Sequence, residues 1–266
     1  MKWAILALTL LIAPAAAAEL LTVTCDEEGE ASCDRDMLTA RMTRERDQVA
    51  AFLGVAADRP IAIHVGTMWR GRPIEVAQAW PEFGRIVVPT RILARGIAPT
   101  AHEITHVLVG RGAGNLMTEG LAVLTHARFG EQPAFPNFGR PLEQALGMAL
   151  SALPQLDMPP TPARINAWID GMDDFQHRRL GYLLAGLFCQ HLLLERLDGD
   201  RVRFLRLYKT GDYEGIIGET ADAAFAPVGI VKSDPAGKVR PAVPASFLDH
   251  VEIVGVAHDI ARAPFV

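Results

Sequence analysis

The chain has 266 residues, a formal net charge of −5 and a hydrophobic fraction of 50%, which is ample for a packed globular core. It contains no block of lysine or arginine and no aromatic residues interleaved with basic ones. Nucleic acid is therefore not an expected partner.

The N-terminus has the layout of a secretory signal peptide. A positive charge at Lys2 precedes an apolar run over residues 3–12, which is followed by Pro14 and an alanine run over residues 15–18. This pattern predicts cleavage after Ala18 and export of a mature protein, residues 19–266, to the periplasm or the medium. The alternative is an uncleaved signal that anchors the chain to a membrane. No membrane span is expected in the mature chain.

The three cysteines fall into two groups. Cys25 and Cys33 bracket an acidic turn, and in an oxidising compartment this spacing favours a short disulfide loop. Cys189 lies among apolar residues, so we expect it to behave as a small buried hydrophobic residue.

Periodicity in the N-terminal half predicts one helix and two strands. Apolar residues recur at helical intervals over residues 34–53, where Asp34 or Asp36 would start the helix. Strand-like runs follow over residues 60–65 and 84–89, separated by a loop rich in glycine and proline. The second run fits either the edge or the interior of a sheet.

A helix pair is predicted next. Residues 99–109 lack helix breakers, with Thr100 as a possible cap, and a second helix spans residues 116–129. Beyond them the pattern is mostly helical, interrupted by prolines at residues 159–162, with helices expected over residues 142–153, 177–197, 200–209 and 245–254. The fold class is therefore α+β: a sheet and helix part at residues 19–130 and a helical part at residues 131–266.

The first predicted helix of this pair carries the sequence His102-Glu103-Ile104-Thr105-His106. Residues four apart lie on one face of a helix, so His102 and His106 can point at a common zinc ion. A catalytic zinc site takes a third protein ligand and leaves a fourth position for water. The pattern HExxHxxGxxH is excluded because Val109 and Gly112 stand where its glycine and third histidine would be.

Glu119 is the first acidic residue downstream, after a glycine-rich turn. A helix, a tight reversal and a second helix would bring it over the histidine pair. The small residues Gly120 and Ala122 would let the second helix pack closely on the first. His126, on the same helical face as Glu119, could be an outer partner of the site or a competing ligand.

These two segments, His102-Glu103-x-x-His106 and Thr118-Glu119-Gly120-x-Ala122, resemble the gluzincin zinc metallopeptidases, especially the small single-domain type. The resemblance implies a zincin-like sheet, a Zn²⁺ cofactor bound by His102, His106 and Glu119, and activation of the metal-bound water by Glu103. It covers mainly residues 98–126. The gap before Glu119 is shorter than in thermolysin, and the chain lacks the Gly-x-Met-Glu-Asn segment of aminopeptidases.

Peptide hydrolysis also needs a donor to the developing oxyanion. The start of the predicted helix 177–197 offers His177, Arg178, Arg179 and Tyr182. Tyr182 is preferred as the catalytic donor because small gluzincin domains often have a tyrosine in a corresponding later helix. The alternative is a tyrosine that only packs in a helix interface.

The sequence therefore predicts an exported zinc metallopeptidase that acts on peptides or proteins, with an endopeptidase preferred over an exopeptidase. Two alternatives stay open: a zinc hydrolase of another amide, such as a cell-wall peptide, and a zinc-binding scaffold without catalysis. The presence of Glu103 argues against the scaffold because such a site needs no general base.

Overall fold

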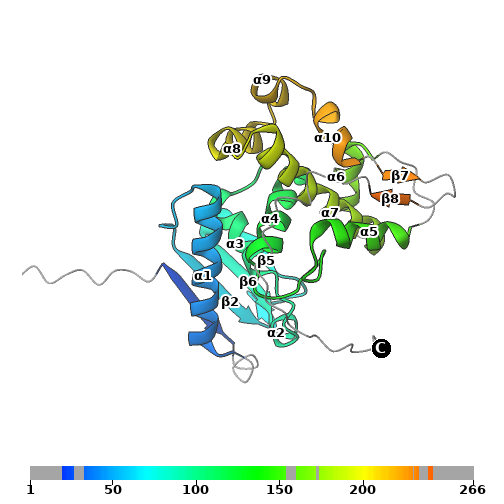
Figure 1. Cartoon of the computed structure of the whole chain (residues 1–266). Coiled ribbons are helices and arrows are strands. Elements are labelled where there is room, and N and C mark those ends of the chain that lie inside the picture. Colours follow the sequence, from blue (N-terminus) through cyan, green and yellow to red (C-terminus); the bar gives the residue numbers. More distant parts are fainter. Residues whose placement is uncertain are drawn as a thin grey trace, which may run out of the picture. The chain divides into compact units, whose positions relative to one another are not determined.

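The computed structural model describes residues 20–26, 33–153, 160–171, 174–229, 231–233 and 239–241. It is a mixed α+β structure with a small sheet and a helical C-terminal half (Figure 1). The chain divides into two compact units, the first up to Arg111 together with Arg128–Ala134, and the second formed by Gly112–Ala127 and the residues from Phe135 onward. The predicted signal peptide and the predicted helix 245–254 lie outside the described residues.

The first long helix, α1 (Arg35–Leu53), begins where the sequence predicts. Asp34 is its N-cap, and its carboxylate accepts a hydrogen bond from the backbone N–H of Met37 at 3.0 Å. The helix ends at Gly54 in the left-handed conformation. Just before it, Cys25 and Cys33 form the predicted disulfide.

The main sheet has four strands in the order β1-β2-β6-β5. Strands β1 (Leu21–Cys25), β2 (Ile61–Gly66) and β6 (Arg85–Pro89) are parallel, and β5 (Gln78–Trp80) pairs antiparallel with β6. The run at residues 84–89 is therefore an interior strand. Its edge interpretation is wrong, because β5, which is too short to show a pattern, covers its outer side.

Alternation along the strands divides the sheet into two faces. Ile63 of β2 lies beside Ile86 of β6, and Val65 lies beside Val88. These side chains are buried in one core with residues of α1 and of α3 (Thr100–Val109), so the two helices cover this face (Figure 1).

Short elements connect the strands. A hairpin of β3 (Met68–Trp69) and β4 (Arg72–Pro73) follows β2, the 3₁₀ turn η2 (Pro81–Phe83) joins β5 to β6, and α2 (Thr90–Ala94) follows β6. Gly84 enters β6 with φ +59°, and a Cβ there would lie 2.4 Å from the carbonyl oxygen of Pro60. Only glycine fits this turn.

The second unit is built from helices. They are most of α4 (Asn115–Phe129), α5 (Leu142–Ser151), α6 (Pro162–Asp170), α7 (Phe175–His191), the π-helical turn η3 (Leu192–Arg196), α8 (Arg201–Thr210), α9 (Tyr213–Ile217) and α10 (Ala221–Gly229). A small hairpin of β7 (Val231–Ser233) and β8 (Val239–Pro241) follows.

The predicted helices 142–153, 177–197 and 200–209 are present. The helix α6 was not predicted, and it begins at the last of the prolines expected to interrupt the helical pattern. Pro162 stands in the first turn of α6, where its missing N–H costs nothing, and Thr161 caps that turn. Within the described ranges, no helix is both long enough and apolar enough to cross a bilayer.

Candidate metal centre

The histidine pair lies on α3, whose start differs from the prediction. Thr100 is not a cap: it is the first helical residue, it is 1% exposed, and Pro99 occupies the N-cap position without a side-chain hydrogen bond. The Thr105 hydroxyl donates to the carbonyl of Ala101 at 2.7 Å inside the helix. The helix ends at Gly110.

His102 and His106 are one helical turn apart, as their spacing predicts. Their rings meet edge to face with centroids 4.8 Å apart. His102 is 8% exposed and Glu103, between the histidines, is 6% exposed. Glu103 is also three residues before His106, so the two side chains are neighbours on the helix surface.

The turn before Glu119 is fixed by a set of hydrogen bonds. The N–H of Gly112 donates to the Thr118 hydroxyl, which in turn donates to the carbonyl of Gly114, both at 2.9 Å. The N–H of Ala113 donates to the carbonyl of Tyr208 on α8 at 2.7 Å.

The first turn of α4 is held by α6. The N–H of Leu116 donates to Asn166 at 2.7 Å, and the Asn115 amide donates to Asp170. The bond to Asn166 satisfies a backbone N–H that a helix start leaves open, and the bond to Asp170 joins two side chains.

Gly120, next to Glu119, marks the crossing of α4 with α7. A Cβ at this position would lie 2.4 Å from the carbonyl oxygen of Ala185 and 2.8 Å from the Cys189 sulfur. The sequence predicted that Gly120 serves packing on the preceding helix, but its nearest neighbours are on α7. A glycine in the sequence indicates that another segment approaches closely, but it does not indicate which segment.

His102, His106 and Glu119 form a group that could hold a metal ion. Each offers one ligand atom, and these atoms all lie within 4.8 Å of one another. The proximity that the sequence predicts for Glu119 and the histidines is therefore present. His126 is 4% exposed on α4 and lies outside this group.

The donor set fits zinc. Two imidazole nitrogens and one carboxylate oxygen match a catalytic zinc site with three protein ligands. The identity of the metal stays a prediction.

Tyr208 is a buried residue beside Glu119 that sequence reasoning missed. Its side chain is fully buried, and burial raises its pKa. The nearby charge of Glu119 adds to this shift, and a hydrogen bond with Thr118 opposes it. It therefore connects α8 to the turn and to the predicted glutamate ligand. Nothing in the sequence around Tyr208 indicated this position, because Tyr208 and Thr118 are far apart in the chain.

Tyr182 lies on α7 and is half-buried. Its ring packs against Phe135 with centroids 5.2 Å apart, and the Arg178 guanidinium lies 5.8 Å from its centroid. It is one helical turn before Ala185, which contacts Gly120. Tyr182 thus lies near the part of α7 that meets α4, and its catalytic role stays a prediction.

The other predicted donors have structural contacts. The ring Nδ1 of His177 contacts the carboxylate of Asp174, the N-cap of α7. The Arg179 side chain donates to the carbonyl of Pro136 at 2.9 Å, and burial lowers the pKa of this group.

Cys189 is buried and free, as predicted, and burial raises the pKa of its thiol, which keeps it protonated.

The chain matches none of the known protein families, curated proteins or solved structures with which it was compared.

Proposed function

We propose that the chain is an exported zinc-dependent metallopeptidase of the gluzincin type. The observation that carries the proposal is the convergence of His102, His106 and Glu119, whose ligand atoms lie within 4.8 Å of one another. Glu103 is next to His102 on α3. Two histidines with one carboxylate form a recurrent catalytic zinc set in peptidases. Zinc, when bound, would supply Lewis acidity and lower the pKa of a coordinated water toward neutrality.

Glu103 is the proposed general base. Its carboxylate would accept the proton of the attacking water and pass it to the leaving amine. This transfer needs a group that can take up and release a proton near neutral pH. Its burial removes competing water, and its place one turn before His106 keeps it beside the ligands. A site that only bound metal would not need this carboxylate.

Tyr182 is the proposed donor to the substrate carbonyl oxygen. A phenol can donate a hydrogen bond that strengthens as negative charge develops on that oxygen. Ala185, which contacts Gly120, is three residues further along α7, so the rise along the axis is only about 4.5 Å. Phe135 packs against the Tyr182 ring and limits its movement.

The edge strand β5 supports an endopeptidase. Among the strands of the described residues, β5 ends the sheet beside β6, and it packs near α3. An extended peptide that pairs with such an edge gains main-chain hydrogen bonds along its length and needs no free terminus. This favours cleavage within a chain.

Export is supported by the disulfide between Cys25 and Cys33, because such bonds persist in oxidising compartments. It is also supported by the signal-like N-terminal sequence. Both features agree with an enzyme that works in the periplasm or outside the cell.

The test is a comparison of the zinc-loaded protein, starting at Glu19, with its Glu103→Gln variant on a proteome-derived peptide library. New termini are read by mass spectrometry. We expect internal cleavage by the wild type alone. Equal products from both proteins, or none from a wild type that holds zinc, would overturn the proposal.

A further inference from the structure

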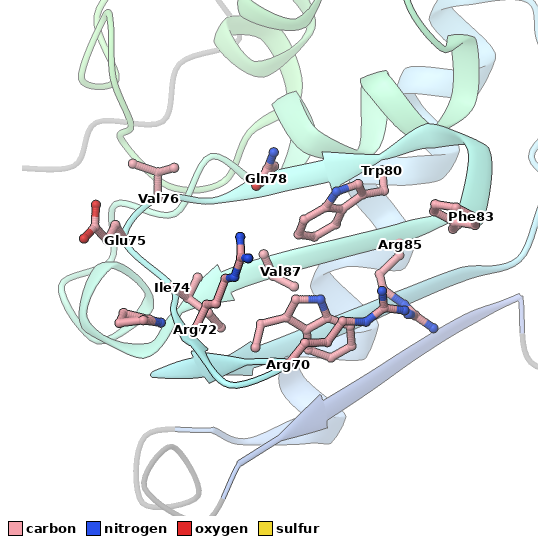
Figure 2. Close-up of a pocket in the computed structure, with 12 residues that line it drawn as sticks. Arg70, Arg72, Ile74, Glu75, Val76, Gln78, Trp80, Phe83, Arg85 and Val87 are labelled. Carbon is pink, nitrogen blue, oxygen red and sulfur yellow. The ribbon is translucent and has the colours of Figure 1, made fainter. Parts of the chain in front are cut away.

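A pocket lies on the other face of the sheet from α1 and α3. This pocket of about 660 Å³ is lined by the hairpin β3–β4, the segment after it, β5, η2 and β6 (Figure 2). Arg85 and Val87 of β6 line it, whereas their neighbours Ile86 and Val88 belong to the core beneath α1 and α3. Because side chains alternate along a strand, the pocket and the two helices are on opposite faces.

The pocket wall carries excess positive charge. Arg70, Arg72 and Arg85 line it together with a single carboxylate, that of Glu75. In the part of the chain that the structure describes, no carboxylate forms an ion pair with any of these arginines. Their guanidinium N–H groups are therefore available to an anion, and their planar shape matches a carboxylate.

Aromatic rings order the arginines and add apolar surface. The guanidinium carbons of Arg70 and Arg85 lie 5.7 and 5.1 Å from the centroid of the Trp69 ring. Such contacts use the face of the guanidinium and leave the N–H donors at its edge.

Trp69 is in turn supported by His64, whose ring centroid lies 4.8 Å away. The Nε2 atom of His64 lies 3.2 Å from the Met68 carbonyl oxygen. The Trp69 ring beside Arg70 and Arg85 is therefore held in place by its contact with His64.

Large apolar side chains also line the pocket. Trp80 of β5 is half-buried and Phe83 of η2 is 72% exposed, although both are large hydrophobic residues. Exposed aromatic surface beside charged donors is typical of a binding site. Figure 2 shows these rings and the arginines around one hollow.

We propose that this pocket binds an acidic peptide segment in which carboxylates alternate with apolar side chains. The arginines would bind the carboxylates, and Trp80 and Phe83 would contact the apolar residues. A peptide also suits the strand β5, which lines the pocket and ends the sheet. The overall charge of −5 disfavours a long polyanion, which would meet repulsion beyond the pocket.

This inference rests on the proposed function in one respect, since it makes the acidic segment part of a polypeptide substrate. The pocket would hold the substrate away from the bond to be cleaved. An acidic stretch in the substrate would then lower KM and so raise kcat/KM, while kcat would stay constant.

The test measures binding without cleavage. A short labelled peptide that alternates glutamate with leucine is titrated into zinc-loaded Glu103→Gln protein and followed by fluorescence anisotropy. A second peptide carries glutamine in place of glutamate. We expect the acidic peptide alone to bind, and its affinity to fall about tenfold in the additional variant Arg72→Gln, the loss of one charge-assisted contact.

The matched control is Arg95→Gln, because Arg95 is exposed in the same unit and does not line the pocket. Glu103→Gln protein that also carries Arg95→Gln should bind the acidic peptide as tightly as Glu103→Gln protein alone. Arg72 is itself exposed, so its replacement should leave the melting temperature unchanged.

Equal binding of the two peptides, or equal losses in Arg72→Gln and Arg95→Gln, would overturn the inference. Tighter binding of an acidic oligosaccharide than of the peptide would also overturn it. Binding without any cleavage by the wild type would instead refute the peptidase and leave the pocket in place.

Discussion

Gly120 of α4 approaches the backbone of Ala185 on α7 so closely that a Cβ at position 120 would lie 2.4 Å from the Ala185 carbonyl oxygen. The contact is backbone against backbone, so neither side can move aside as a flexible side chain would. It fixes the residue next to the predicted ligand Glu119 against the helix that carries Tyr182.

Gly120→Ala should therefore destabilise the protein although alanine favours helices. Overpacking of this kind costs about 1–3 kcal/mol, more than the gain in helix propensity of about 1 kcal/mol. Urea unfolding of the zinc-free protein measures the change in free energy of unfolding. An unchanged midpoint would show that α4 and α7 are further apart than described.

Tyr208→Phe should weaken metal binding with little effect on the fold. The variant removes the hydroxyl that lies near Glu119 and bonds with Thr118, and a lost hydrogen bond costs about 1 kcal/mol. Competition with a chromogenic chelator measures the zinc affinity.

Tyr213→Phe is the matched control for that variant. Burial raises the pKa of Tyr213 as well, but Glu119 is not among the causes. If both variants lost the same zinc affinity, the effect would be general and Tyr208 would not support the ligand.

Tyr182→Phe should lower kcat by about 10²–10³, the usual effect of removing one oxyanion donor. Zinc content and KM should stay close to wild type, because the phenol would act only as charge develops. Steady-state kinetics on a peptide found in the library experiment give both constants. A normal kcat would assign Tyr182 to packing against Phe135 alone.

The core beneath the start of α3 contains a buried carboxylate, Glu45, which is 0% exposed. It accepts a hydrogen bond from the N–H of Glu131 at 2.9 Å. Burial raises its pKa above the ordinary value of 4.5, and the charge of Glu131 adds to this shift. Thr100, the backbone N–H of Glu131 and the charge of Arg41 act in the opposite direction. The folded state therefore binds the Glu45 proton more tightly than the unfolded state.

The stability that this proton gives is fully present below pH 4.5, the ordinary pKa of the carboxyl, and is lost as pH rises through the raised folded pKa. Glu45→Gln removes the titration, so its free energy of unfolding should fall less than that of the wild type over this pH range. Urea unfolding at a series of pH values measures both profiles. Parallel profiles would show that Glu45 has the same pKa in both states.

The sequence predicts those features of the site that depend on local spacing. The distance from His102 to His106 is one helical turn whatever the tertiary structure. Asp34 caps α1 by accepting a hydrogen bond on its side-chain carboxylate from Met37, only three residues away. The turn before Glu119 was predicted because glycines mark a reversal within a few residues.

Other features depend on segments distant in the chain and could not be predicted. Gly120 indicates close packing, but its partner Ala185 lies on another helix. Strand β5 has only three residues, too few for periodicity, so β6 could not be assigned to the interior. The pocket lined by Arg70, Arg72 and Arg85 combines a hairpin with two strands, so no single stretch of sequence indicates it.

The most direct test of the metal centre measures zinc stoichiometry and peptide hydrolysis together in three proteins: the wild type, Glu103→Gln and Glu119→Ala. The account predicts one tightly bound zinc and activity in the wild type, zinc without activity in Glu103→Gln, and loss of both in Glu119→Ala. Wild-type zinc affinity in Glu119→Ala, or full activity in Glu103→Gln, would contradict it.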